Sequence, residues 1–213
     1  MYSDSHGVFR RLECFLEPPP VLLVISGPSG VGKDSVLNRM RELGYPFHFV
    51  VTMTDRAPRP GEVDGVDYWF VSTEEFEHMV EHGEMFEYAR VYGQYKGVPK
   101  AQIREALAGG RDVAMRVDVQ GAATIRRRVP GTLTVFLAPP SLDVLVDRLR
   151  RRSGDSPEQI SRRLQTALAE MERMQEFKYV VVNREGELDR AVKDIMAIIQ
   201  AEKCRTDRVV PII

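Results

Sequence analysis

The sequence predicts an α/β fold, with a parallel-sheet core and helices on both of its faces. Short apolar runs rich in β-branched residues alternate with longer segments of helical character, a pattern typical of strand–helix–strand units. The first such run, residues 21–26, is apolar up to its last residue, as expected for a strand buried on both faces. The 213 residues, 43% hydrophobic, can form one sizeable core, so we expect one domain with inserted lobes.

Strands and helices are expected to alternate after this first strand. Further strands are predicted at residues 47–52, 68–71, 84–92, 112–117, 133–138 and 179–182. Helices are predicted at residues 35–43, 73–82, 99–108, 122–129, 142–152, 157–176 and 188–202. The strand at 47–52 should lie beside the first strand, and residues 93–97 should turn the chain.

Local signals support some of these boundaries. Ser72 and Glu75 form a capping box before one helix, and Pro99 suits the first turn of the next. The strands at 68–71 and 84–92 fall between two core strands along the chain. We therefore expect them to form a small antiparallel lobe.

A glycine-rich turn directly follows the first strand. Its spacing, Gly27-x-x-x-x-Gly32-Lys33, lets backbone N–H groups surround an anion, while the following helix adds its positive dipole end and Lys33 a full charge. This pattern predicts a site for the phosphates of a nucleoside triphosphate; a glycine-rich turn with an incidental lysine is the alternative. The next residue is Asp34, where the pattern has a Ser or Thr whose hydroxyl binds Mg²⁺.

Composition and charge exclude several functions. With 30 Lys and Arg against 31 Asp and Glu, the net charge of −1 does not favour a nucleic-acid binder or a membrane-surface protein. No apolar run approaches the ~20 residues that span a bilayer, and the N-terminus, which has no apolar stretch, is not expected to be a secretory signal. Cys14 and Cys204 have no metal-binding or redox spacing, so we expect a reduced, cytoplasmic compartment.

Residues 1–17 precede the stiff break at Pro18, Pro19 and Pro20 and are expected to form a mobile extension. An amphipathic docking segment at residues 8–16 is the alternative for this region.

Two further regions carry arginines suited to phosphate. Arg56 and Arg59 lie in a loop that Pro and Gly keep irregular, and a guanidinium binds phosphate oxygens through a planar fork. A solvated charged loop is the alternative. Arginines also gather on both sides of a Gly/Ser/Pro-rich segment at 153–157, a pattern that favours a mobile cover over phosphates, with a plain surface helix as the alternative. They are Arg148, Arg150, Arg151, Arg152, Arg162 and Arg163.

Several motifs of this chain resemble those of the guanylate kinase family. They are G-P-S-G-V-G-K at 27–33, R-x-x-R-P-G-E-V-D-G-x-D-Y at 56–68, E-Y-A from Glu87, V-D-V-Q-G around Asp118 and A-P-P-S ending at Ser141. The resemblance spans residues 21 to about 200. It implies a parallel-sheet core, a small mixed α/β GMP-binding lobe and a helical lid, and transfer of a phosphoryl group from Mg·ATP to GMP or dGMP.

The resemblance also implies domain boundaries. An N-terminal extension and Pro linker would occupy residues 1–20, the kinase-like domain 21–205 and a tail 206–213. Within the domain, the core would comprise 21–52 and 99–205, the GMP-binding lobe 53–98 and the lid about 150–165.

The same resemblance assigns roles by position. Glu87 is expected to read guanine, because one carboxylate can accept from the two adjacent N–H donors of that base, whereas adenine presents an acceptor there. The expected GMP-binding residues are Thr52, Arg56, Arg59, Tyr68, Glu87, Lys96, Gly97 and Asp118. The expected ATP-binding residues are Gly27, Pro28, Ser29, Gly30, Val31, Gly32, Lys33, Asp34 and Asn183. The expected catalytic residues are Lys33, Arg56, Arg148, Arg152 and Arg163.

This chain departs from the family pattern at four positions. Lys96 replaces a phosphate-binding tyrosine, and Val98 replaces a hydroxyl residue on the guanine side. Asp34 replaces the hydroxyl on Mg²⁺, and Arg116 replaces an aspartate. An aspartate gained and one lost near the same strand edge suggests an exchange, so we expect Asp34 either to ligate Mg²⁺ or to pair with Arg116.

The leading hypothesis is a catalytic guanylate kinase that uses Mg²⁺, binds ATP and GMP, and has no nucleic-acid or membrane partner. It is expected to be a monomer or homodimer. The main alternative is a non-catalytic guanylate-kinase-like module that binds a phosphopeptide, although such modules typically lack a working phosphate loop and lid. A kinase for another phosphorylated small molecule is a third possibility, which Glu87 argues against.

Overall fold

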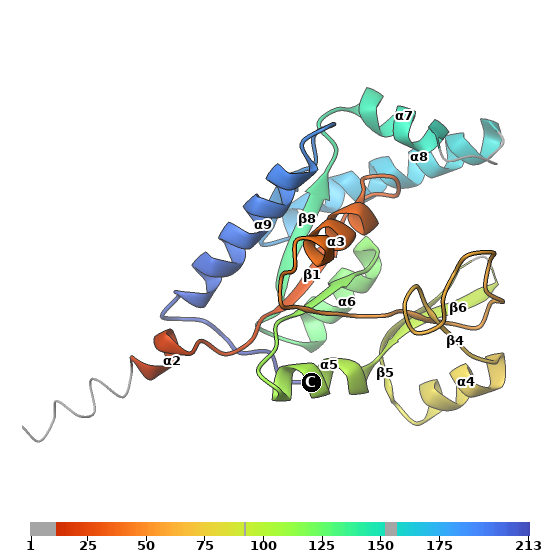
Figure 1. The fold of residues 1–213 in the computed structure, drawn as a ribbon. Helices are drawn as coiled ribbons and strands as arrows, with labels where there is room; N and C mark the ends of the chain where they lie inside the picture. Colours follow the sequence, from red (N-terminus) through yellow and green to blue (C-terminus); the bar gives the residue numbers. More distant parts are fainter. Residues whose placement is uncertain (1–11, 92, 152–156) are drawn as a thin grey trace, which may run out of the picture.

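The computed structural model describes residues 12–91, 93–151 and 157–213 (Figure 1). The predicted mobile extension therefore lies mostly outside the described residues. Of that region the structure describes a short helix, α2 (Glu13–Leu16). Within the described parts of the chain, no helix combines the length and apolar character needed to cross a bilayer.

The core is a parallel sheet, as the sequence predicts, and its strand order is β2-β7-β1-β8-β9. Its strands are β1 (Leu22–Ser26), β2 (His48–Phe49), β7 (Val113–Arg116), β8 (Leu133–Ala138) and β9 (Tyr179–Val182). The expectation that residues 47–52 pair with the first strand was wrong, because β7 lies between β1 and β2. Strands β1, β7 and β8 are almost wholly buried and fill the centre, whereas the half-buried β2 suits an edge.

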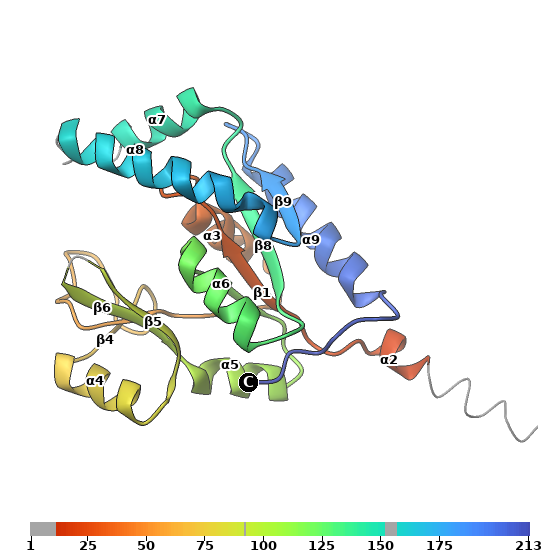
Figure 2. The same ribbon diagram turned by 180° about the vertical axis from the view of Figure 1, so that it is seen from behind.

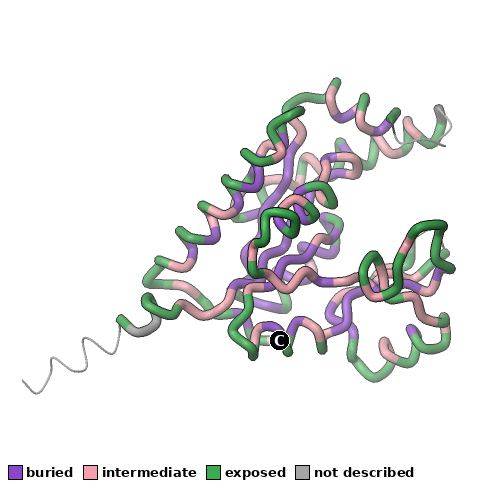
Figure 3. The backbone as a smooth tube through the Cα atoms, in the orientation of Figure 1, coloured by how far each residue is buried: buried purple, intermediate pink, exposed green. Residues whose placement is uncertain are grey.

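Helices cover both faces of this sheet, and β1 shows why. Leu22 and Val24 pack with α5 (Lys100–Ala108) and α6 (Val119–Arg128) in one apolar cluster, while Leu23 and Ile25 pack with α3 (Lys33–Glu42) and α9 (Leu188–Lys203) in another. Figure 3 shows the buried strands at the centre and exposed outer faces on the helices. Successive β1 side chains therefore belong to opposite layers of the core.

A second, four-stranded sheet forms the smaller lobe, with strand order β4-β3-β6-β5. Its elements are β3 (Met53–Thr54), β4 (Trp69–Phe70), α4 (Thr73–Glu81), β5 (Met85–Val91) and β6 (Gln94–Pro99). The sheet is mixed and not purely antiparallel, because β3 and β4 run parallel. The Ser72 side chain accepts the Glu75 N–H at 3.0 Å, which confirms the predicted cap of α4.

Residues 93–97 were predicted to turn the chain, and this was largely wrong. Gly93 has a positive φ of 81°, but Gln94 already begins β6, which pairs with β5 on one side and with β3 on the other. Lys96 and Gly97 are thus strand residues opposite Thr54 and Met53. Pairing between segments some 40 residues apart decides this conformation, and local turn signals do not reveal it.

Two helices, α7 (Leu142–Arg151) and α8 (Pro157–Glu172), extend together beyond the end of the core sheet (Figures 1 and 2). The long helix was predicted to continue to residue 176, but its last turn is a 3₁₀ helix, η1 (Arg173–Glu176). Leu145, Leu149 and Ala167 form a small apolar cluster between α7 and α8. Arg152 and residues 153–156 of the Gly/Ser/Pro-rich segment lie outside the described residues, and Pro157 begins α8.

The C-terminal tail lies against the core. Arg208 donates to the backbone oxygens of Pro19 and Pro20 at 2.7 and 2.6 Å, and Ile213 packs on the apolar cluster that contains Leu22. These contacts join the segments before and after the predicted domain to its body.

Candidate active site

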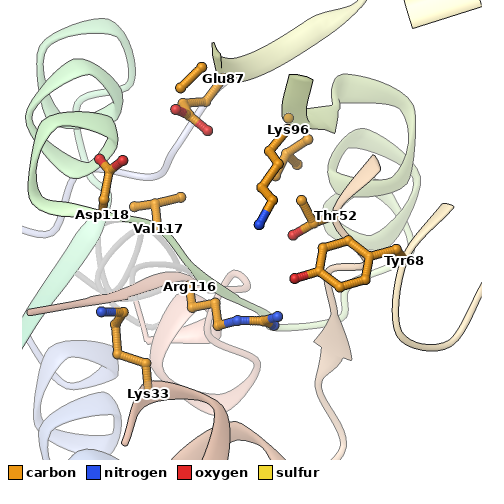
Figure 4. Close-up of a pocket in the computed structure, with 11 residues that line it drawn as sticks. Lys33, Thr52, Tyr68, Glu87, Lys96, Arg116, Val117 and Asp118 are labelled. Carbon is orange, nitrogen blue, oxygen red and sulfur yellow. The ribbon is translucent and has the colours of Figure 1, made fainter. Parts of the chain in front are cut away.

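A cavity of about 190 Å³ lies between the carboxyl edge of the core sheet and the smaller lobe (Figure 4). It is lined by Lys33, Thr52, Tyr68, Glu87, Ala89, Lys96, Gly97, Val98, Arg116, Val117 and Asp118. The cavity therefore brings the phosphate-loop lysine together with most of the predicted GMP-binding residues, which come from separate segments. Ala89 and Val117 were not predicted as site residues, although strand alternation places Ala89 on the same face as Glu87, and Val98 was noted only as a departure on the guanine side.

Glu87 and Asp118 form an acidic end of this cavity. Burial raises the pKa of Glu87 to about 7, and the nearby carboxylate of Asp118 contributes. Asp118 is the N-cap of α6 and accepts the Gly121 N–H at 2.6 Å. Glu87 has no hydrogen-bond partner among the residues that the structure describes. It is therefore a desolvated carboxyl group that a ligand with N–H donors would satisfy.

Lys96, Tyr68 and Thr52 lie on another side of the cavity, with the Lys96 Nζ 5.6 Å from the centre of the Tyr68 ring. Gly97 follows Lys96, and a Cβ added to it would lie 2.4 Å from Met85 Cε and 2.8 Å from the Glu87 backbone oxygen. A side chain at position 97 would thus push β5 and β6 apart. The glycine allows the two strands that carry Glu87 and Lys96 to approach closely.

Arg56 and Arg59 do not line this cavity. The Arg56 guanidinium donates two hydrogen bonds to Glu62, at 2.7 and 2.6 Å, and lies 4.9 Å from the centre of the Tyr68 ring. Only 9% of Arg56 is exposed, and its guanidinium contacts the Tyr68 ring without lining the cavity. Arg59 is exposed, and its backbone N–H donates to the same Glu62 carboxylate.

The phosphate loop connects β1 to α3. Gly27 has φ 138°, and a Cβ there would lie 2.2 Å from the Leu137 backbone oxygen, so only glycine fits. The Lys33 Nζ donates to the backbone oxygens of Gly27 and Pro28 at 2.6 and 3.1 Å. Burial lowers the pKa of Lys33, which indicates a site that anions would stabilise. Helix α3 begins at Lys33, two residues before its predicted start.

Glu170, on α8, also contacts this loop and was missed by the sequence analysis. Its Oε2 accepts the Ser29 N–H at 3.3 Å, and burial raises its pKa although Lys33 opposes this. A carboxylate thus occupies an N–H group of the predicted phosphate site. The two residues are 141 positions apart, and no local pattern links them.

Asn183 and Arg148 hold the outer side of the loop. Asn183 Nδ2 donates to the Val31 backbone oxygen at 2.8 Å, and Arg148 donates to the same oxygen at 3.2 Å and to the Asn183 backbone oxygen at 3.0 Å. Arg163 is partly buried on α8, and Arg152 lies outside the described residues.

Asp34 and Arg116 form an ion pair between Oδ1 and Nε. This confirms the second of the two expected alternatives for these residues. Arg116 ends β7, and Asp34 lies in the first turn of α3, so neighbouring strand and helix termini bring the two together. Arg116 also helps to lower the pKa of Lys33, which places the two cations close to each other.

Comparisons with known proteins agree with this geometry. The guanylate kinase family model matches residues 20–202. A chloroplastic/mitochondrial guanylate kinase 2 of Oryza sativa is 48% identical over 97% of this chain and 76% of its own length. The guanylate kinase of Corynebacterium diphtheriae is 48% identical over 84% of this chain and 93% of its own length.

One solved structure supports the same assignment. The crystal structure of guanylate kinase from Anaplasma phagocytophilum superimposes with a TM-score of 0.71 and 31% identity, and 89% of each chain is covered. The matched segment includes the phosphate loop, the smaller lobe and the two projecting helices. This chain therefore belongs to the guanylate kinase family.

Proposed function

We propose that this protein transfers the terminal phosphoryl group of ATP to GMP, and to dGMP, with Mg²⁺ as the metal. The observation that carries the proposal is the single cavity lined by both Lys33 of the phosphate loop and Glu87 of the smaller lobe. Such transfer needs no covalent intermediate. It depends on holding two nucleotides end to end and on neutralising charge around an in-line transition state.

The acceptor side is suited to a guanine nucleotide. The ionised Glu87 carboxylate would accept from the two adjacent N–H donors of guanine, and adenine would leave this desolvated group unpaired. Lys96 and Tyr68, on another side of the same cavity, would bind the phosphate as donors. The cavity thus offers a carboxylate for the base and a cation for the phosphate.

The ATP side of the site is the phosphate loop, residues 27–33, which ends at Lys33. Its backbone N–H groups and the start of α3 would hold the ATP phosphates, and Lys33 would turn from the Gly27 and Pro28 oxygens to them. Asn183 would lie beside the bound ATP base. Arg148 and Arg163, with Arg152 beyond the described residues, would act as lid and core arginines around the transferring group.

Asp34 fits a magnesium ion. Mg²⁺ is commonly held by one or two carboxylates together with substrate phosphates and water. The Asp34 side chain is 59% exposed; Arg116 engages its Oδ1, and its Oδ2 has no hydrogen-bond partner in the described part of the chain. When bound, the ion would neutralise charge on the ATP phosphates. Asp34 would hold it where other phosphate loops use a hydroxyl.

The proposed partners are ATP and GMP, without nucleic acid or membrane, and a monomer or homodimer remains our expectation for assembly. The cytoplasmic location stays a prediction, and one of the matched relatives is named as chloroplastic/mitochondrial.

The test is ADP production by the purified protein with Mg·ATP and, in turn, GMP, dGMP, AMP and no acceptor. We expect rapid turnover with GMP and dGMP and almost none with AMP. Equal rates with AMP and GMP would contradict the role of Glu87. No turnover despite GMP binding would favour the non-catalytic, phosphopeptide-binding module instead.

A further inference from the structure

Arg116 is the cation of the cavity that the family resemblance does not explain. It ends β7 opposite Ile25 of β1, so the sheet places it beside the phosphate loop. Its side chain is 28% exposed and lines the same cavity as Lys96, Tyr68 and Glu87. Three cations, Lys33, Lys96 and Arg116, therefore border one small space.

The hydrogen-bonding groups of Arg116 are only partly used. Asp34 engages Nε, and the two terminal nitrogens have no hydrogen-bond partner among the described residues. Figure 4 shows the guanidinium end of Arg116 directed away from Lys33, toward the side of the cavity that carries Tyr68 and Thr52. The two terminal nitrogens thus point toward the side of the cavity where Lys96 and Tyr68 are proposed to bind the phosphate.

We propose that Arg116 binds the phosphate of the acceptor nucleotide through its two terminal nitrogens, while Asp34 engages only Nε. A planar guanidinium can bind two phosphate oxygens at once. It therefore fixes the orientation of the phosphate, and with it the direction of the attacking oxygen, and it also neutralises part of the negative charge. Lys96, a point charge, cannot do this alone. Arg116 thus supplies orientation on the side of the acceptor phosphate that faces the ATP loop.

The proposal rests on the acceptor being GMP, as proposed above, and it predicts that only one member of the ion pair is needed for GMP binding. If the pair only maintained structure, Arg116→Met and Asp34→Asn would both disturb the cavity and both weaken GMP binding. If Arg116 binds the phosphate, Arg116→Met loses the contact. Asp34→Asn removes a carboxylate that competes with the phosphate for the same guanidinium.

The experiment is calorimetric titration of GMP and of guanosine, which lacks the phosphate, without ATP and with EDTA to remove metal ions. We expect Arg116→Met to weaken GMP binding about 30-fold and to leave guanosine binding within about two-fold of wild type. Arg116→Lys should weaken GMP binding about five-fold, because it keeps the charge and loses the fork. Asp34→Asn should leave GMP binding unchanged or strengthen it up to about three-fold.

Arg39→Met is the matched control. Arg39 lies on α3 with a side chain 32% exposed and pairs with Asp189 at 2.6 Å, outside the cavity. This variant should bind GMP as wild type does. Weaker GMP binding in both Arg116→Met and Asp34→Asn, or an equal loss for guanosine, overturns the proposal. If wild type itself binds no GMP, the proposed function fails first, so the two failures are distinguishable.

Discussion

The phosphate loop and the smaller lobe hold their charged groups in opposite ways. In the loop, Lys33 donates to two backbone oxygens of the loop itself, and Glu170 accepts one of its N–H groups. In the lobe, Glu87 is desolvated without a hydrogen-bond partner in the described structure, and the Lys96 ammonium, 5.6 Å from the centre of the Tyr68 ring, has no hydrogen-bond or ion-pair partner there either. The donor site therefore satisfies its own groups, whereas the acceptor site leaves them to the ligand.

This difference indicates which site contributes mainly to the rate of phosphoryl transfer and which mainly to substrate selection. A loop that exchanges internal hydrogen bonds for those of a ligand gains little net binding energy but can place charge where the transition state needs it. A desolvated group without a partner gains the most when the correct ligand arrives. We therefore expect substitutions in the loop to affect kcat most, and substitutions in the lobe to affect substrate choice.

The largest effect is expected for Lys33→Met. The loss of this buried cation beside the transferring group should lower kcat about 1,000-fold, with a smaller change in the KM for GMP. Steady-state kinetics with Lys193→Met, an exposed lysine on α9, as control would check this. A Lys33→Met enzyme that kept wild-type kcat and lost only GMP affinity would contradict the claim that the loop acts mainly on kcat.

Glu87→Gln is expected to have the next largest effect. The amide presents one acceptor and one donor to the two N–H groups of guanine, so kcat/KM for GMP should fall about 100-fold while ATP affinity stays within about two-fold. Glu74→Gln, an exposed glutamate on α4, is the control. Equal losses for both nucleotides would mean that Glu87 supports the fold and does not read the base.

The pKa of Glu87 gives a pH dependence with a definite sign. Because the folded-state pKa is about 7, above the ordinary 4.5, the carboxylate that accepts from guanine is lost as pH falls through 7. kcat/KM for GMP should therefore decrease below about pH 7 in wild type, and this limb should be absent in Glu87→Gln. An identical decrease in both would assign the titration to another group.

The same shift links Glu87 to stability. The folded protein binds this proton more tightly than the unfolded chain, so stability falls as pH rises from about 4.5 to 7. Glu87→Gln should thus gain in relative unfolding free energy between pH 5 and pH 8, measured by urea titration. A constant difference between the two proteins over this range would contradict the burial argument.

Glu170→Gln should have a smaller effect, of opposite direction. It removes a negative charge from beside the ATP phosphates while keeping an oxygen for the Ser29 N–H. The KM for ATP should fall about five-fold, which corresponds to about 1 kcal/mol. Glu172→Gln, exposed on the same helix, is the control. A raised KM would show that Glu170 organises the loop more than it repels the ligand.

The smallest effect is expected from Ser72→Ala at the N-cap of α4. The lost hydrogen bond to Glu75 should lower the unfolding free energy by about 1 kcal/mol. The capped helix lies outside the cavity lining, so kcat and the KM for GMP should not change. Altered kinetics in this variant would mean that the lobe is less rigid than its packing suggests.

The sequence could predict features that local patterns determine. The phosphate loop is a contiguous motif after a buried strand, and the ends of β8 and β9 follow directly from their apolar runs. The pair of Asp34 and Arg116 was also foreseeable, because one departure from the family pattern compensated the other in charge.

Features that depend on distant pairing could not be predicted in this way. The place of β7 between β1 and β2, and the strand character of Lys96, arise from contacts between segments far apart in the chain. The sequence around Glu170 is typical of a surface helix, and only the packing of α8 brings its carboxylate to the phosphate loop. Arg56 is a residue type that commonly binds phosphate, yet its guanidinium contacts Glu62 and Tyr68 and does not line the cavity.

The central claim is that one cavity holds both nucleotides for direct phosphoryl transfer. The most direct measurement follows the label from ATP labelled at its terminal phosphate, with GMP as acceptor. We expect the label in the terminal phosphate of GDP, in an amount equal to the ADP formed. Label released as inorganic phosphate, or retained on the protein, would contradict direct transfer between the two sites.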